Sequence, residues 1–293
     1  DGGHRTPFFF HWPNENFTQS HDINKLTANI DILPTLLDLC NIELSEKDKA
    51  RINGTSLVPL LKGHNKSWPN RVLITDSQRI EHPIKWRKSA TMTERWRLIN
   101  GNELYNIQND PAQRDNIADK NPKIVQKLRE NYENWWSLVS KRFDEDVPIP
   151  IATKKEPISI LTTHDWHNEN STCAWNQSLI REGLECNGRW TIDVPVCGEY
   201  IFELRRWPRE EDRPVIDSIP GKLTYYYGGR SIEVTNARIC IDGQVKSKTI
   251  EPNDKGICFT FYLEPGEKSL ETQFTNKGEI SLGAYYVYVK KLN

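Results

Sequence analysis

The chain has 293 residues, 37% of them hydrophobic and 27% charged, with a net charge of −1, which is typical of a globular protein long enough for two cores. This charge balance argues against a large nucleic-acid-binding surface. The sequence contains no stretch of about 18 apolar residues, so it predicts no membrane span. The six cysteines lack C-x-x-C spacing and predict no zinc site. They are interpreted as buried thiols or, in an exported protein, as up to three disulfides.

The chain begins with a glycine turn that leads into an apolar run. A Gly-Gly pair precedes His4 and Arg5, and a proline follows. Residues 8–10 are all Phe, which predicts a short strand buried on both faces, as in an α/β fold. We interpret the turn as the place where such a fold presents a polar group at a sheet edge. An ordinary tight turn before a strand is the alternative.

The next element is a short helix predicted over residues 31–40. Its apolar side chains recur at i, i+3, i+4 and i+7, which predicts that this face lies in the core. These residues are Leu33, Leu36, Leu37 and Cys40.

Residues 79–88 (RIEHPIKWRK) form a strongly basic loop between two predicted strands. The Asn100-Gly101 pair farther on predicts a hairpin turn, so a small antiparallel sheet carries the loop at one end. In one interpretation its cations meet an anionic substrate. In the other they form a solvated edge that protects the sheet.

Residues 121–142 predict the clearest helix. Asn121 suits the N-cap and Pro122 suits the first helical position. The apolar side chains that follow have helical spacing, which predicts packing against the small sheet. They are Ile124, Leu128, Tyr132, Trp135 and Val139.

Residues 144–157 contain three prolines and several charges, which predicts a linker. Beyond it, apolar and polar residues alternate in short segments separated by turns such as Asp242-Gly243. This pattern predicts an all-β sandwich or jelly-roll domain over residues 158–293.

Two groups of residues in this second half are candidates for a metal site or a sugar-binding site. His164 and His167 would face opposite sides of a strand, so they do not predict a metal pair. Several aromatic and basic residues are interpreted as core packing, with a sugar-stacking platform as the alternative. They are Trp166, Trp175, Trp190, Trp207, Arg205 and Arg206.

Four sequence blocks occur in an order that resembles the sulfatase family. They are DGGHRTP with its apolar run and Trp-Pro, DILPTLLDL (31–39), NGTSLVPLLKG (53–63) and ELYNIQNDPAQRDNIA (103–118). A further stretch, KWRKSATMTERWRLING (85–101), is similar to bacterial arylsulfatase-like proteins. The resemblance covers residues 1–143. It implies the C-terminal portion of an alkaline-phosphatase-like α/β sulfatase domain, with a small antiparallel sheet and a packing helix.

The resemblance also implies what the intact enzyme would need. Family members hydrolyse sulfate esters with a formylglycine nucleophile and a calcium ion, and carry these residues and a catalytic Lys upstream of the glycine turn. This chain is therefore expected to supply no catalytic nucleophile and no metal ligand. Ser67 lies in an S-x-P-x-R match, which we interpret as chance because Asn70 replaces the Ser of the family motif.

We predict that His4, Arg5, His82 and Lys85 lie near the substrate sulfate. Arg5 matches the family motif, and the other three rest on spacing and charge. The expected partners are a sulfated small molecule or glycan and the missing N-terminal half of the sulfatase domain, with neither nucleic acid nor membrane. The chain alone is expected to be inactive, and the protein to be periplasmic or secreted.

Two alternatives of other classes remain open from the sequence. The chain is a non-catalytic carbohydrate-binding or structural fragment, or it is part of a related phosphatase or phosphodiesterase.

Overall fold

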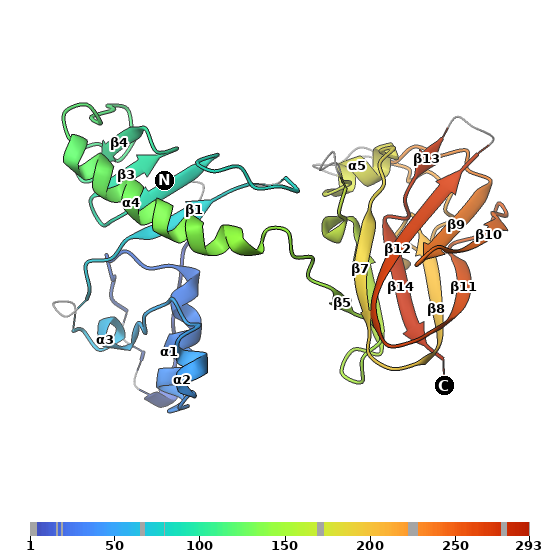
Figure 1. Ribbon diagram of the computed structural model, residues 1–293, viewed down its shortest axis with the longest axis horizontal. Coiled ribbons are helices and arrows are strands. Elements are labelled where there is room, and N and C mark those ends of the chain that lie inside the picture. The colour runs from blue at the N-terminus through green and yellow to red at the C-terminus, as the bar shows by residue number, and fades with distance from the viewer. Residues whose placement is uncertain are drawn as a thin grey trace. The chain divides into compact units, whose positions relative to one another are not determined.

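The computed structural model describes residues 5–15, 17–18, 20–64, 68–78, 80–168, 173–221, 228–276 and 280–292. His4 and Ser67 therefore lie outside the described residues. The chain divides into two compact units (Figure 1). Unit 1 comprises Asp1–Gln78 and Pro83–Arg142, and unit 2 comprises Arg79–His82 and Phe143–Asn293.

Unit 1 contains an antiparallel sheet with the strand order β1-β2-β3-β4. Its strands are Leu73–Asp76, Ser89–Met92, Trp96–Ile99 and Glu103–Asn106. The turn between β3 and β4 has Asn100 at φ +48° and Gly101 at φ +73°. Both angles lie in the left-handed region that a tight hairpin turn requires, so the predicted hairpin is confirmed.

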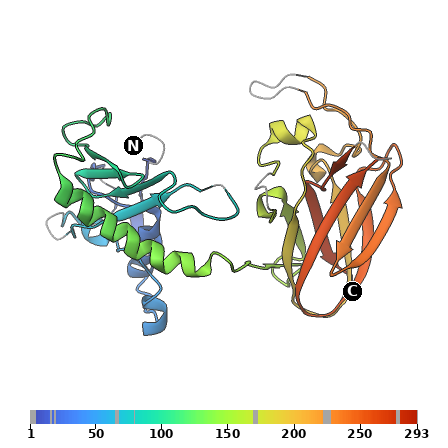
Figure 2. The same ribbon diagram turned by 45° about the horizontal axis from the view of Figure 1, so that its top comes forward.

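The long helix of unit 1, α4 (Pro122–Val139), covers this sheet in both views (Figures 1 and 2). Val125 and Leu128 of the helix form a buried cluster with Leu98 and Leu104 of the sheet. This confirms the predicted packing. Asn121 does occupy the N-cap position, but its side-chain amide donates to the carbonyl of Ile117 instead of capping the helix. No helix in the described part of the chain is long and apolar enough to cross a membrane.

The short helices of unit 1 are α1 (Ile32–Leu39), α2 (Glu46–Lys49) and α3 (Val58–Leu61). Asp31, which precedes α1, is fully buried and joins segments on both sides of these helices. Its carboxylate accepts hydrogen bonds of 2.8 Å from the backbone of Ala28 and Thr55 and from the Arg71 guanidinium. A Cβ on Gly54 would lie 1.9 Å from the Ile30 carbonyl oxygen, so this close approach requires glycine.

Two predictions for unit 1 are wrong. Leu33 and Leu36 of α1 are 56% and 48% exposed, whereas Thr35 on the opposite side is buried. Phe8 and Phe9 are also exposed and form no strand. The physical reason is the same in both cases, because the described residues place no strand or helix against either apolar surface.

Unit 2 is built from β-strands. In its described part, one sheet has the order β10-β9-β12-β7-β5, with β13 paired to β12, and another has the order β11-β8-β14-β6. All pairings are antiparallel except that of β5 with β7. The bounds of the first sheet are Gln244–Thr249, Asn236–Ile241, Gly266–Thr275, Arg189–Val194, Ile149–Pro150 and Ser281–Leu282. Those of the second are Ile257–Leu263, Gly198–Arg205, Tyr286–Lys291 and Ile158–Thr162.

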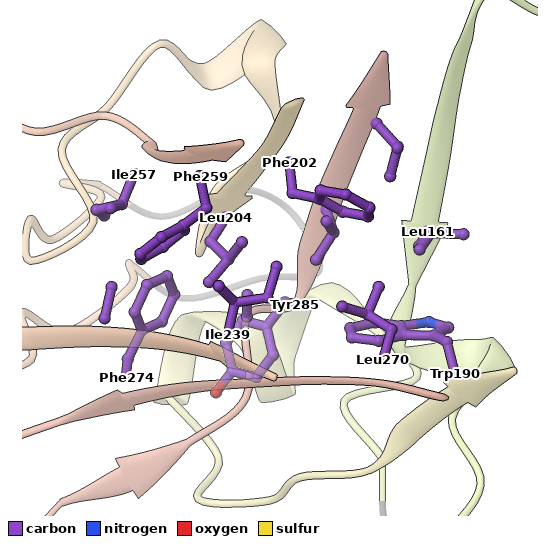
Figure 3. Packing of buried hydrophobic residues seen from close by; sticks show 14 of the residues in the cluster. Leu161, Trp190, Phe202, Leu204, Ile239, Ile257, Phe259, Leu270, Phe274 and Tyr285 are labelled. Carbon is purple, nitrogen blue, oxygen red and sulfur yellow. The ribbon is translucent and has the colours of Figure 1, made fainter. Parts of the chain in front are cut away.

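The buried side chains of both sheets of unit 2 belong to one hydrophobic cluster (Figure 3). Phe202 and Phe259 come from one sheet, and Trp190 and Phe274 from the other. The predicted alternation is confirmed in β8 and β11, where every second residue is buried. The sequence also alternates at Leu223, Tyr225 and Tyr227, which predicts a further strand, but these residues lie outside the described part of the chain.

The predicted linker over residues 144–157 needs a correction. Ile149–Pro150 is a strand that pairs with β7, and Ile151 is completely buried. The Ala152 N–H also donates to the Ser159 hydroxyl. Alternating Ile and Pro can extend along a sheet edge, since an edge strand leaves N–H positions unpaired and so accommodates proline.

Candidate functional site

The loop between β1 and β2 carries two of the predicted site residues, and the structure separates them. Lys85 forms an ion pair with Glu133 on α4 and is 41% exposed. His82 is exposed and belongs to the short segment that groups with unit 2, where neighbouring Glu81 contacts His167 at 2.7 Å.

Trp86, next to Lys85, is the unexpected centre of this loop. Its φ of +67° is rare for a residue with a large side chain. The indole stacks on the ring of Tyr132 with centroids 3.7 Å apart. The backbone N–H of Trp86 donates to the Tyr132 hydroxyl at 2.9 Å, and that hydroxyl donates to the Asp76 carboxylate at 2.8 Å. These contacts offset a backbone strain of roughly 1–3 kcal/mol.

The β3–β4 turn closes against the same indole. A Cβ on Gly101 would lie 2.8 Å from the Trp86 ring, so the close approach needs glycine as much as the positive φ does. The Arg129 side chain on α4 donates to the Gly101 carbonyl at 2.5 Å. Helix, turn and loop therefore hold Trp86 in one position.

A hollow of about 340 Å³ opens beside this stack. Its lining combines the indole, two side-chain amides, a guanidinium and a carboxylate, contributed by Trp86, Asn100, Gly101, Asn102, Arg129 and Glu133. Such a set offers hydrogen bonds to hydroxyl groups and opposite charges to an ionic ligand. We refer to it below as the Trp86 hollow.

A second group of cations lies near the start of the chain. Arg97 of β3 is only 6% exposed, and its guanidinium donates to the Trp96 carbonyl at 3.0 Å. Burial and then the positive charge of Arg5 lower the pKa of Arg97 to about 10. Arg5 itself is exposed.

Part of the chain is similar to known proteins. The model of the family described as N-sulphoglucosamine sulphohydrolase, C-terminal, matches residues 1–136. Residues 1–136 are therefore similar to the C-terminal part of sulfatases. We call them the sulfatase segment. N-acetylglucosamine-6-sulfatase from Bos taurus is 28% identical over 139 residues, which is 35% of this chain and 24% of that protein. The chain thus spans about a quarter of the length of this relative.

Solved structures with some likeness include two family 35 carbohydrate-binding modules. The one from Clostridium thermocellum is 12% identical, with a TM-score of 0.26, and the match covers 46% of this chain and 98% of that one. The one from Cellvibrio japonicus is also 12% identical, with a TM-score of 0.26, and coverages of 46% and 94%. TM-scores this low support no conclusion about fold or ligand.

Three of the four predicted site residues lie in the described part of the chain, and each has different surroundings. Lys85 adjoins the Trp86 hollow, Arg5 adjoins Arg97, and His82 groups with unit 2. The roles of Trp86 and Arg97 were missed. The positive φ of Trp86 cannot be predicted from the sequence. The KWR stretch at residues 85–87, which resembles sulfatases, could have pointed to Trp86.

The aromatic residues of unit 2 that were considered for sugar binding are mostly buried. Trp166, Trp190 and Trp207 are 6%, 0% and 0% exposed, while Trp175 is 55% exposed. Arg206 is also fully buried and lies under the Trp207 ring, with its guanidinium carbon 4.3 Å from the ring centroid. Burial lowers the pKa of Arg206 to about 10.

Arg206 is a structural residue, because its Nη2 donates to the carbonyls of Ile180, Arg181 and Arg230. These bonds join distant segments of unit 2.

Potential metal ligands are dispersed. Among the residues that the structure describes, no group of three or more His, Cys, Asp or Glu side chains is arranged to hold a metal ion. His164 contacts the Trp175 carbonyl at 2.7 Å, and His167 contacts Glu81 and Asp146.

Proposed function

We propose that this chain is part of a sulfuric ester hydrolase in which the sulfatase segment forms one wall of the substrate site. The observation that carries the proposal is the family match over residues 1–136, which contain the two cationic positions Lys85 and Arg5. The nucleophile and calcium would be held by the rest of a sulfatase domain, where they supply attack on sulfur and charge stabilisation. The residues of this chain would attract and orient the sulfate ester.

The exposed apolar surfaces of unit 1 support the idea of a further partner domain. Phe9 is 91% exposed, and Phe8, Leu33 and Leu36 are about half exposed at 55%, 56% and 48%. Large apolar side chains that stay exposed are typical of contact surfaces. We propose that the N-terminal part of a sulfatase domain packs there and gives the Phe run the buried strand position that its sequence predicts.

We propose that the two sheets of unit 2 form a β-sandwich accessory domain for a polysaccharide substrate. The exposed indole of Trp175 supports this role, because a solvent-facing tryptophan offers a flat apolar surface to a sugar ring. A carbohydrate-binding fragment without catalytic activity is the second candidate function. A periplasmic or secreted location fits both, since sulfated glycans are extracellular polymers.

The test compares the chain alone with a longer protein that includes the upstream part of the sulfatase domain. Sulfate-ester hydrolysis with added calcium is expected only from the longer protein. Turnover by the chain alone would contradict the placement of the nucleophile. Inactivity of the correctly matured longer protein, with retained binding of sulfated glycans, would favour the carbohydrate-binding candidate.

The role of the cations is tested in the longer protein with Lys85→Ala and Arg5→Ala. Each charge-assisted bond to sulfate contributes roughly 1.5–3 kcal/mol, so loss of one is expected to lower kcat/KM by about ten- to a hundredfold. Lys88→Ala is the matched control, because Lys88 is exposed on the same loop. Glu133→Gln removes the partner of Lys85 and is expected to leave kcat/KM unchanged or higher.

Equal losses of stability from Lys85→Ala and Glu133→Gln, with no change in KM, would mean that Lys85 only anchors α4.

A further inference from the structure

The Trp86 hollow presents hydrogen-bond donors that the fold itself does not use. The Arg129 guanidinium donates through Nε to the Gly101 carbonyl at 2.5 Å, which restrains its orientation. The two terminal nitrogens of the guanidinium, Nη1 and Nη2, have no acceptor among the residues that the structure describes. Because Arg129 is exposed, these N–H groups can reach a ligand in the hollow.

Two side-chain amides on the β3–β4 turn add to this set of donors. The Oδ1 of Asn100 accepts a hydrogen bond of 3.1 Å from the Ser89 N–H. This contact orients the amide and leaves its NH2 group for a ligand. The side chain of Asn102 is exposed and makes no hydrogen bond within the described part of the chain. The turn and α4 therefore direct donors into the same hollow.

The charges around the hollow leave one cation without a counter-ion. Glu133 supplies the one carboxylate among the described lining residues, and it forms an ion pair with Lys85. Within the described ranges, no carboxylate pairs with Arg129. Since the charges of Lys85 and Glu133 cancel, the hollow keeps the positive charge of Arg129 and attracts an anion.

We propose that the Trp86 hollow binds a sugar unit that carries a carboxylate. A carboxylate is planar and accepts two parallel N–H bonds, which matches the Nη1 and Nη2 groups of Arg129. The ring hydroxyls of the sugar accept hydrogen bonds from the amides of Asn100 and Asn102. Trp86 gives the hollow an apolar side that suits the C–H groups of the ring.

The size of the hollow sets the length of the ligand. Its volume is about 340 Å³, at the lower end of the roughly 300–1,000 Å³ that small-molecule sites occupy. The hollow therefore suits one sugar unit at a time.

The place of this sugar in a substrate rests on the proposed function. There, Lys85 contacts the sulfate of the substrate, and Lys85 adjoins the hollow through its ion pair with Glu133. The sugar with the carboxylate is then the neighbour of the sulfated sugar along the glycan.

The primary test measures binding to the chain alone, so its result does not depend on hydrolysis. The isotope-labelled chain is titrated with methyl glucuronide, and NMR follows the Gly101 backbone amide and the side-chain amides of Asn100 and Asn102. Methyl glucoside and a methyl glucoside sulfate are the uncharged and the sulfated comparisons. We expect saturable shifts with glucuronide, with a Kd on the order of 1–10 mM, and at least about tenfold weaker binding of the glucoside.

Three results of this titration would overturn the proposal. They are the absence of saturable shifts at these amides, equal binding of glucuronide and glucoside, and tighter binding of the sulfated sugar than of the glucuronide.

Variants test the role of the guanidinium. Arg129→Gln is expected to weaken glucuronide binding by about ten- to a hundredfold. Lys127→Gln is the matched control, because Lys127 is exposed on α4, lies outside the lining and loses the same charge. Equal losses in both variants would show that only the overall charge matters and would overturn the proposal.

Asn102→Ala leaves the bond between Arg129 and Gly101 in place and is expected to weaken binding by about two- to tenfold. The same spectra show whether each variant is folded. If Arg129→Gln disturbs the turn, unchanged binding in Asn102→Ala still contradicts the site.

The link to hydrolysis is tested separately in the longer protein that includes the upstream part of the sulfatase domain. Arg129→Gln should raise KM for a glycan with a carboxylate-bearing neighbour by about tenfold more than KM for a simple aryl sulfate. Equal changes in both KM values would contradict the place of this sugar beside the sulfated unit. Failure of the parent longer protein to hydrolyse any sulfate ester would instead contradict the proposed function.

Discussion

The indole of Trp86 lies flat against the phenol ring of Tyr132, with centroids 3.7 Å apart and an interplanar angle of 20°. The Tyr132 hydroxyl accepts a hydrogen bond from the backbone N–H of Trp86 and donates one to Asp76. The Tyr132 side chain therefore supports both the indole ring and the strained backbone of Trp86. Burial raises the pKa of Tyr132, which keeps its hydroxyl protonated as the donor in this chain of bonds. The loop that carries Lys85 owes its shape to α4.

Tyr132→Phe is expected to keep the ring stack and lose both hydrogen bonds. The free energy of unfolding should fall by about 1–3 kcal/mol, because the Trp86 N–H and Asp76 lose their shared partner. Urea unfolding followed by tryptophan fluorescence measures the change. Ser137→Ala, on an exposed position of α4, is the control and should change stability by less than about 0.5 kcal/mol.

Arg71→Met is expected to destabilise unit 1 strongly. It leaves the fully buried Asp31 carboxylate without its cation, which typically lowers the free energy of unfolding by about 3–5 kcal/mol. Lys49→Met is the matched control, because its pair with Glu46 is exposed and contributes at most about 1 kcal/mol. Similar small losses in both variants, measured by denaturant unfolding, would contradict a structural role for the Asp31–Arg71 pair.

Stability is expected to fall at alkaline pH. The hydrogen bond to Glu103 raises the pKa of Tyr105 to about 12, and burial raises that of Tyr285. Because an unfolded tyrosine titrates near pH 10, the unfolded chain releases protons that the folded chain retains. The stabilisation is complete below pH 10 and is lost as the pH rises through 12.

Unfolding midpoints at pH 8, 10 and 11, together with tyrosinate absorbance, check this expectation. Tyr105→Phe should remove part of the pH dependence. Titration of all tyrosines near pH 10 in the folded chain would contradict it.

Limited proteolysis is expected to cut first within residues 143–148. Only the start of the predicted linker is expected to be open to proteases. The later part is protected, because Ile151 is buried and the strand Ile149–Pro150 pairs with β7. The C-terminal product should remain folded and melt cooperatively. Mass spectrometry of the first products and circular dichroism of the purified fragment test this. Immediate degradation of all residues beyond 158 would argue against an independent second domain.

The Lys246→Met, Lys248→Met double variant is expected to aggregate. Lys248 donates to the Cys258 carbonyl at 2.7 Å and Lys246 donates to the Thr260 carbonyl, so both lysines cover backbone groups of the edge strand β11. Without them the edge can pair with other chains. Light scattering during a temperature ramp measures the change. Lys290→Met, at an exposed position of the central strand β14, is the control and should scatter like the parent chain.

The sequence by itself determined the local elements and the resemblance of the first half to sulfatases. The Asn100-Gly101 turn, the helix beginning at Pro122 and the alternating strands β8 and β11 follow from backbone preferences and periodicity, which are properties of neighbouring residues. The resemblance to sulfatases likewise follows from the order of the four sequence blocks alone. The exposure of the apolar side of α1 could not be predicted from the sequence. An apolar stripe shows which face of a helix can pack, but not whether another element packs against it.

Only the tertiary structure decided the contacts between residues distant in the chain. The ion pair of Lys85 with Glu133 and the stack of Trp86 on Tyr132 each depend on how separate elements pack. Local sequence does not specify such packing, since its free energy comes from surfaces that meet only in the folded chain. A tryptophan at positive φ is stable here because Tyr132 of α4 and Gly101 both lie close to its ring.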